Sequence, residues 1–185
     1  MKIGYVLYYG MTWLDFIGIY DPISRLKSMN CLPELTWEFC SFTENAADAF
    51  GLAMKPNSIK QTLAIYDVII IPGGCGTTTL LTDDLFKAWI QSAESVPCKV
   101  SVCTGSLILG FAGFLKDKRA TTNFAEYDNL KSYCREVVEE RIVEDGDIIT
   151  AGAVSSSIDL GLYLCEKWAG ADIREAIRHE MDYKG

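Results

Sequence analysis

The sequence predicts an α/β fold, a three-layer sandwich in which a mostly parallel β-sheet is covered by helices on both faces. Short apolar runs rich in β-branched residues alternate along the chain with segments of helical periodicity, the pattern of a parallel sheet with helical crossovers. The run YDVIII at residues 66–71 is apolar enough to be buried on both sides. The length of 185 residues, without internal repeat or linker, fits a single domain over residues 1–185.

The first half of the chain contains four predicted strands and two predicted helical segments. Lys2 to Tyr9 is an apolar, β-rich run ended by Gly10, and helix signals follow from Thr12 to Met29. Because Pro22 has no backbone N–H to donate, we expect this helix to break at Asp21–Pro22. The remaining elements are strands at residues 35–42, 53–59 and 66–71 and a helix at residues 83–95.

The second half continues the alternation and ends in helices. A strand at residues 99–102 leads into a helix at residues 104–115, followed by a short strand at residues 119–122 and a short helix at residues 125–133. Asp145-Gly146 is a strong hairpin signal and predicts two strands within residues 137–151. Helices at residues 155–168 and 171–181 close the chain.

Composition excludes several classes of function. The chain has 17 basic and 25 acidic residues, and a net charge of -8 argues against a nucleic-acid or anionic-membrane surface. No apolar segment approaches 18 residues, and the N-terminus lacks a secretory signal, so we expect no membrane span and a cytoplasmic location. Seven cysteines, none separated by only two residues, and one histidine, His179, give no metal-site spacing, and in a reducing compartment the thiols would be free.

Cys103 is the strongest candidate for chemistry. It lies between a predicted strand and a predicted helix with no loop residues to spare, so the turn must be sharp, a nucleophile elbow in form. A thiol at a helix N-terminus is expected to have a lowered pKa and to be the most reactive of the seven. A buried structural cysteine is the equally plausible alternative.

A second candidate is the glycine-rich turn after residues 66–71. Gly74, Cys75 and Gly76 can expose backbone N–H groups, which suits an oxyanion hole or an anion-binding nest. The turn lacks the lysine of a phosphate-binding loop and the third glycine of a dinucleotide fingerprint. A tight strand-to-helix connection would explain it equally well.

Asp15 is an acid among apolar neighbours near the end of the first predicted strand. If it is buried, its pKa should rise and the carboxyl would be protonated. Thr12 and Asp15 also have the spacing of a capping box, in which the acid only satisfies a backbone donor, and this structural role is slightly favoured.

Three segments taken together resemble a known family. PGGCGTTTLLTDD, SVCTGSLILGFAGFLKDKRATTNF and VEDGDIITAGAVSSSIDLGLYL, in this order, are similar to the ThiJ/PfpI superfamily, flavodoxin-like relatives of the class I glutamine amidotransferases. The MTWLDFIGIYDP segment is similar to the isonitrile hydratase branch, in which an early aspartate faces the nucleophile.

The resemblance implies roles for particular residues. Cys103 would be the nucleophile, Asp15 its acid/base partner and Thr104 a third contributor, with the Gly74 to Gly76 backbone lining the pocket and a homodimer as the working form. Many relatives carry a histidine at the position of Asn123 in this chain. We expect Asn123 to line the substrate pocket or to contribute to the oxyanion hole. Because Asn cannot carry a proton at neutral pH, a protease-type triad is disfavoured.

The function implied is a cofactor-independent hydration of small organic isonitriles to N-substituted formamides. Two alternatives use the same cysteine. One is a glyoxalase-type or deglycase-type enzyme acting on α-oxoaldehydes, and the other is a redox-sensing or ligand-binding module. The aromatic and aliphatic residues between Thr12 and Ile19 suggest an apolar pocket wall, which favours the isonitrile.

Overall fold

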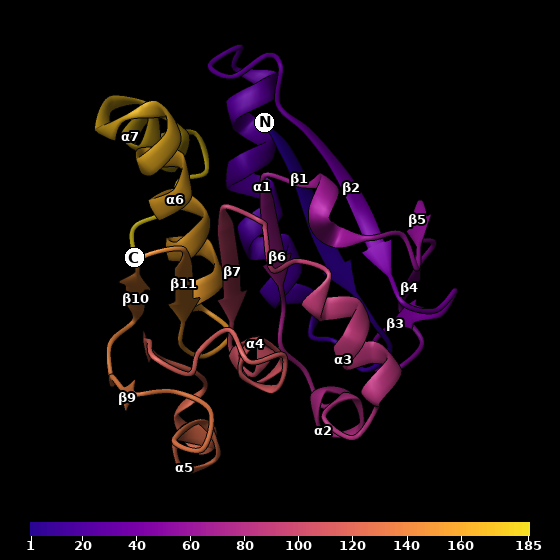
Figure 1. Cartoon of the computed structure of the whole chain (residues 1–185). Coiled ribbons are helices and arrows are strands. Elements are labelled where there is room, and N and C mark those ends of the chain that lie inside the picture. The colour runs from indigo at the N-terminus through magenta and orange to yellow at the C-terminus, as the bar shows by residue number, and fades with distance from the viewer.

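A seven-stranded sheet forms the centre of the molecule in the computed structural model, which describes all residues from 1 to 185 (Figure 1). The strand order is β10-β11-β7-β6-β1-β2-β5, and every neighbouring pair is parallel except the β10–β11 hairpin. The α/β class with a mostly parallel sheet is therefore confirmed. The strands are β1 (Lys2–Leu7), β2 (Thr36–Ser41), β5 (Ser58–Ile59), β6 (Val68–Ile71), β7 (Cys98–Val102), β10 (Ile142–Asp145) and β11 (Ile148–Ala151).

The order of the strands creates a crevice at the carboxyl edge of the sheet. From β1 the chain goes to β2 on one side, and it later returns to β6 on the other side of β1. The connections that leave β1 and β6 therefore run in opposite directions, and ligands of open α/β sheets bind where this happens. The glycine-rich turn after β6 and the predicted elbow at Cys103 after β7 both lie at this edge.

Helices cover both faces of the sheet (Figure 1). One layer holds three helices that pack against one another, and the other holds two, with two short helices near the carboxyl edge. The first layer consists of α1 (Trp13–Ser28), α6 (Ser156–Ala169) and α7 (Ala171–Glu180). The others are α3 (Asp84–Gln91) and α4 (Gly105–Phe111), then α2 (Thr77–Leu80) and α5 (Tyr127–Leu130) at the edge.

The expected break at Asp21–Pro22 is wrong, because α1 runs through the proline without interruption. Pro22 is buried where α6 crosses α1. A Cβ placed on Gly161 of α6 would lie 2.9 Å from Pro22 Cγ and 3.0 Å from the Gly18 carbonyl oxygen, so the two helices pack almost backbone to backbone there. This tertiary packing holds the helix in spite of the hydrogen bond that proline removes.

Several predicted elements are shorter or divided in the structure. The strand expected at residues 53–59 is two, β4 (Ala53–Met54) and β5, and β4 pairs with β3 (Ala46–Ala47), which was not predicted. The strand at residues 119–122 is only β8 (Arg119–Ala120), paired with β9 (Glu136–Val137). The helix at residues 125–133 is a 3₁₀ turn, η2 (Phe124–Glu126), followed by α5, and a second 3₁₀ turn is η1 (Leu63–Ile65).

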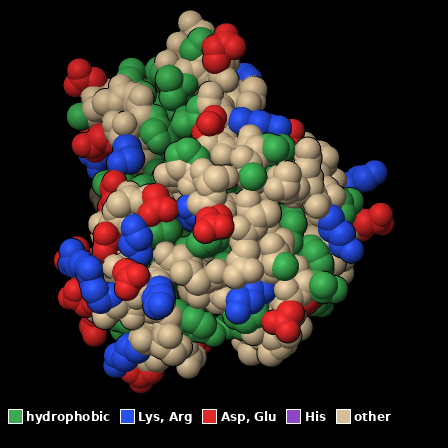
Figure 2. Space-filling model, in the orientation of Figure 1, with side chains coloured by type: hydrophobic (Ala, Val, Ile, Leu, Met, Phe, Trp, Pro, Cys, Tyr) green, Lys and Arg blue, Asp and Glu red, His purple; other side chains and the backbone are tan.

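The surface carries charges of both signs. Figure 2 shows acidic and basic side chains interspersed over the visible face, with no basic patch of the kind that binds a nucleic-acid backbone. No helix has both the length and the apolar character that crossing a bilayer requires.

Candidate active site

The turn between β7 and α4 is the sharp elbow that the sequence predicts. Cys103 has φ of 55°, in the left-handed region that non-glycine residues rarely adopt. Its backbone is held by hydrogen bonds from its N–H to the Gly152 carbonyl (2.8 Å) and from the Thr122 hydroxyl to its carbonyl (2.9 Å). Residue 105, two positions after Cys103, must be a glycine, since a Cβ on Gly105 would lie 2.3 Å from the Ile71 carbonyl oxygen.

Asp15 lies in the interior beside Cys103 and is fully buried. One carboxylate oxygen, Oδ2, accepts a hydrogen bond from the Gly73 N–H at 2.9 Å, and the other, Oδ1, has no hydrogen-bond partner. The Thr12 side chain makes no capping hydrogen bond, and the Thr12 N–H donates to the Gly73 carbonyl instead. The capping-box interpretation of Asp15 is therefore wrong, and the acid belongs to the site.

Burial and mutual repulsion set the protonation of this pair. Burial raises the pKa of Asp15 to about 6, against the hydrogen bond from Gly73, which lowers it. Burial, and then the neighbouring Asp15 carboxylate, raise the pKa of the Cys103 thiol to about 11. Of the two groups, the thiol has the higher pKa, so it holds its proton more tightly than the carboxyl does. The expectation that burial raises the pKa of Asp15 is confirmed, and the expectation of a lowered thiol pKa is wrong.

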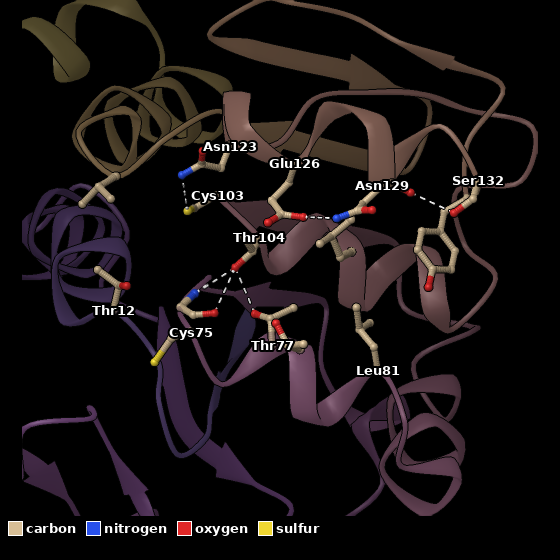
Figure 3. Close-up of a pocket in the computed structure, with 15 residues that line it drawn as sticks. Thr12, Cys75, Thr77, Leu81, Cys103, Thr104, Asn123, Glu126, Asn129 and Ser132 are labelled. Carbon is tan, nitrogen blue, oxygen red and sulfur yellow. Dashed lines mark hydrogen bonds between the residues drawn. The ribbon is translucent and has the colours of Figure 1, made fainter.

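Two donors face the sulfur and favour its anionic form. Asn123 Nδ2 lies 3.4 Å from Cys103 Sγ, and the backbone N–H of Thr104 also donates towards it (Figure 3). The amide of Asn123 is fixed in orientation, because its Oδ1 caps the 3₁₀ turn η2 by accepting from the Ala125 N–H at 3.0 Å. Asn123 therefore offers a hydrogen bond, and not a base, to the reacting group.

The glycine loop after β6 offers a single free backbone donor. The Gly74 N–H donates to Thr104 Oγ1 at 2.9 Å, and the Gly76 N–H donates to the Gly10 carbonyl at 3.0 Å. The N–H of Cys75, between them, has no acceptor within the chain. The loop is locked in place, since a Cβ on Gly74 would lie 2.3 Å from the Gly10 oxygen. Of the predicted oxyanion donors, only Cys75 is available to a ligand.

Thr104 takes part in a chain of hydroxyl groups. Its Oγ1 lies 2.9 Å from Thr77 Oγ1, which lies 3.2 Å from the Tyr8 hydroxyl. Because Tyr8 donates its only hydroxyl proton to the Pro72 carbonyl (2.8 Å), Thr77 must donate to Tyr8 and Thr104 to Thr77. Thr104 Oγ1 is thereby left as an acceptor for the Gly74 N–H. The geometry gives this hydroxyl a role in holding the glycine loop.

A cavity of about 560 Å³ opens above the elbow (Figure 3). It brings together Cys103, Thr104, Gly74, Cys75 and Asn123, which the sequence singled out, but Asp15 is fully buried and does not line it. The predicted apolar wall between Thr12 and Ile19 is wrong, since only Thr12 reaches the cavity. The residues that the sequence did not single out are Thr77, Thr78, Leu81, Leu107, Glu126, Asn129, Ser132, Tyr133 and Val154.

The remaining reactive side chains lie elsewhere. His179 is exposed on α7 and does not line the cavity. All seven cysteines are free thiols, and no group of three or more His, Cys, Asp or Glu side chains has the arrangement of a metal site.

Comparisons with known proteins agree with this geometry. The DJ-1/PfpI family model matches residues 21–167. An isonitrile hydratase from Pseudomonas putida is 33% identical over 184 residues, covering 99% of this chain and 78% of the relative. A ThiJ/PfpI family structure from Pseudomonas syringae is 26% identical with a TM-score of 0.89, covering 100% of this chain and 75% of the other. Drosophila melanogaster DJ-1beta has a TM-score of 0.83 at 18% identity, covering 100% and 98%. The chain belongs to the DJ-1/PfpI family.

Proposed function

We propose that this protein is a cofactor-independent hydratase that converts small organic isonitriles into N-substituted formamides. The observation that carries the proposal is the fully buried Asp15 carboxyl beside Cys103, which itself lines the cavity. The similarity to an isonitrile hydratase supports the choice of substrate class.

The first step adds the thiol to the terminal carbon of R–N≡C. Asp15, ionised above a pKa of about 6, accepts the proton of Cys103 as the sulfur forms its bond to carbon. Asp15 then returns the proton to that carbon, which gives the thioimidate R–N=CH–S–Cys103. Because Asp15 is buried beside Cys103, the proton that it accepts from the sulfur can be returned to an atom bonded to that sulfur.

Water completes the reaction. It adds to the C=N bond of the thioimidate to give R–NH–CH(OH)–S–Cys103, and cleavage of the C–S bond releases R–NH–CHO while the thiol regains its proton. The free N–H of Cys75 and the amide of Asn123 are the donors available to the developing negative charge in this cavity. Thr104 contributes as a positioning residue through its hydrogen bond to Gly74.

The site suits this reaction better than an α-oxoaldehyde isomerisation. Moving a proton between two carbons benefits from a second base in contact with substrate, and the position that faces the sulfur is an amide, Asn123. Hydration of an isonitrile needs one proton carrier, and Asp15 is sufficient. We further propose that the protein acts as a homodimer.

The test is to incubate the protein with cyclohexyl isonitrile and to follow N-cyclohexylformamide by chromatography, with methylglyoxal consumption measured in parallel. We expect formamide from the wild type and from Cys75→Ala, which removes a thiol that bonds the Gly10 carbonyl but keeps the backbone N–H, and none from Cys103→Ala. Methylglyoxal consumption without formamide would show an α-oxoaldehyde enzyme instead. Failure of both reactions would reject the hydratase and favour a sensing role for Cys103.

A further inference from the structure

The cavity has one charged side chain on its wall. Of the fifteen residues that line it, only Glu126 carries a formal charge. No lysine, arginine or histidine forms an ion pair with it, although other acidic side chains of the surface do have such partners. Its one hydrogen-bond partner is neutral, Asn129 Nδ2 at 2.5 Å. The Glu126 carboxylate is therefore uncompensated where a ligand would lie.

The position of Glu126 is fixed by the same turn that positions Asn123. The Glu126 N–H donates to the Asn123 carbonyl at 2.8 Å, and the Asn123 side chain both caps η2 and donates to the Cys103 sulfur. In Figure 3 the Glu126 side chain extends from η2 towards the space that Cys103 and Thr104 also face. A substrate bonded to the sulfur must direct its side group into this same space.

Both acids near the reacting atom have the same sign. The buried Asp15 lies beside Cys103 and Glu126 lines the wall, while no basic side chain lines the cavity. In a cavity, where the effective dielectric constant is below that of water, such charges act more strongly than on an open surface. An anionic side group would be repelled by both acids, and a cationic one attracted.

We infer that Glu126 is a specificity-determining residue that selects substrates whose side group carries a positive charge, such as an alkylammonium, and rejects carboxylates. The inference rests on the proposed function for the reacting group, an isonitrile, and adds the chemistry of the side group. The neighbouring Asn129 and Ser132 supply polar contacts for the same group.

The first arm of the test compares three isonitriles of matched length that end in trimethylammonium, tert-butyl or carboxylate. The trimethylammonium and tert-butyl groups have nearly the same shape, so their difference reports charge. In Glu126→Gln, which keeps the size of the side chain and a partner for Asn129, kcat/KM for the cation should fall by about tenfold and that for the carboxylate should rise, with the neutral substrate changed less than twofold. An equal loss for all three would overturn the inference, because it would indicate a catalytic or structural role.

The second arm does not depend on turnover. Cys103 is thiolated with the cationic reagent (2-trimethylammonioethyl) methanethiosulfonate or the anionic reagent (2-sulfonatoethyl) methanethiosulfonate, and the rates are read by mass spectrometry. Trypsin places Cys103 and Cys75 on different peptides, since Lys87 and Lys99 lie between them. The ratio of the two rates cancels any change in the intrinsic reactivity of the thiol. We expect this ratio to fall by about tenfold in Glu126→Gln.

Asp128→Asn is the matched control. Asp128 lies two residues from Glu126, is exposed, pairs with Lys131 at 2.6 Å and does not line the cavity. Asp128→Asn therefore changes the net charge of the protein by the same amount as Glu126→Gln without changing the cavity. Its ratio should equal that of the wild type. An unchanged ratio in Glu126→Gln would overturn the inference. A lowered ratio in a protein that hydrates no isonitrile would uphold the charge preference and reject only the proposed function.

Discussion

At the scale of single residues, Asp15 and Cys103 form a buried pair in which the carboxylate helps to raise the pKa of the thiol. The two groups come from different parts of the chain and meet only through the contact of α1 with the loops after β6 and β7. Replacing Asp15 should therefore lower turnover and at the same time raise the reactivity of the Cys103 thiol. Together these two effects distinguish a proton carrier from an acid with only a structural role.

Asp15→Asn should lower kcat for isonitrile hydration by 10²-fold or more, since the amide can accept the Gly73 hydrogen bond but cannot carry a proton. The same change should speed alkylation of Cys103 by iodoacetamide, because removal of the carboxylate lowers the pKa of the thiol from about 11. Turnover and peptide-resolved alkylation are measured on one preparation. Slower alkylation together with lost turnover would instead indicate a disturbed elbow.

Asp15 also makes stability depend on pH. Its pKa is raised from 3.8 to about 6 on folding, so the folded state binds this proton more tightly than the unfolded state. The stabilisation is complete below about pH 4 and is lost as the pH rises through about 6. We expect urea unfolding of the wild type to show about 3 kcal/mol less stability at pH 7.5 than Asp15→Asn, with the difference shrinking towards pH 4. A constant difference at all pH values would contradict this origin.

At the scale of elements, the amino end of β7 is held by an ion pair between a buried lysine and a partly exposed aspartate. Lys99 is almost fully buried in the strand, and its ammonium bonds Asp147 Oδ2 at 2.9 Å and the Val96 carbonyl at 2.8 Å. Asp147 also pairs with Lys118 at 2.8 Å. This cluster joins β7 to the turn of the β10–β11 hairpin, at the end of the strand opposite to Cys103.

Asp147→Asn should destabilise the fold by about 2 kcal/mol, because it leaves the buried Lys99 charge without its carboxylate. The hydrogen bonds of the two lysines lower the pKa of Asp147 to about 2, so this contribution is present above the ordinary pKa near 4 and is lost as the pH falls through about 2. Chemical unfolding at pH 7 measures the difference. Asp128→Asn, in an exposed pair, should change stability by less than about 0.5 kcal/mol. Equal effects of the two substitutions would show that burial of Lys99 adds nothing.

At the scale of the whole molecule, apolar side chains remain exposed near the start of α1. Leu14 and Ile17 are 47% and 44% exposed, and Phe50 and Leu52 of the β3–β4 segment are 96% and 60% exposed. The indole N–H of Trp13 donates to the Leu52 carbonyl at 2.9 Å and joins the two groups. A surface of this kind is typical of a protein interface.

We expect light scattering at micromolar concentration to give a mass of about 41 kDa, twice the 20.5 kDa of the chain. Ile17→Lys should shift the protein towards the monomer by placing a charge within the exposed apolar group, and Leu85→Lys, at another exposed apolar position on α3, should not. A mass near 20.5 kDa for the wild type would reject the homodimer.

The sequence alone predicted what depends on local patterns. The alternation of apolar and helical segments gave the fold class, the Asp145-Gly146 pair gave the hairpin, and the absence of loop residues around Cys103 gave the elbow. Each of these is determined within a few residues by periodicity, turn chemistry or chain geometry. Pro22 shows the limit of such reasoning, since its local preference was overridden by the close packing of α6.

Only the tertiary structure decided the chemistry of the site. Asp15 meets the Gly73 N–H across 58 residues of sequence, and that contact excluded the capping box. The apolar neighbours of Asp15 predicted the rise of its pKa, whereas the raised pKa of Cys103 depends on burial and on a carboxylate from another segment, which no local pattern contains. The free N–H of Cys75 and the unpaired Glu126 became visible only when every neighbouring donor and acceptor had been placed. The sequence determined which residues reach the carboxyl edge of the sheet, and three-dimensional packing determined their protonation and partners.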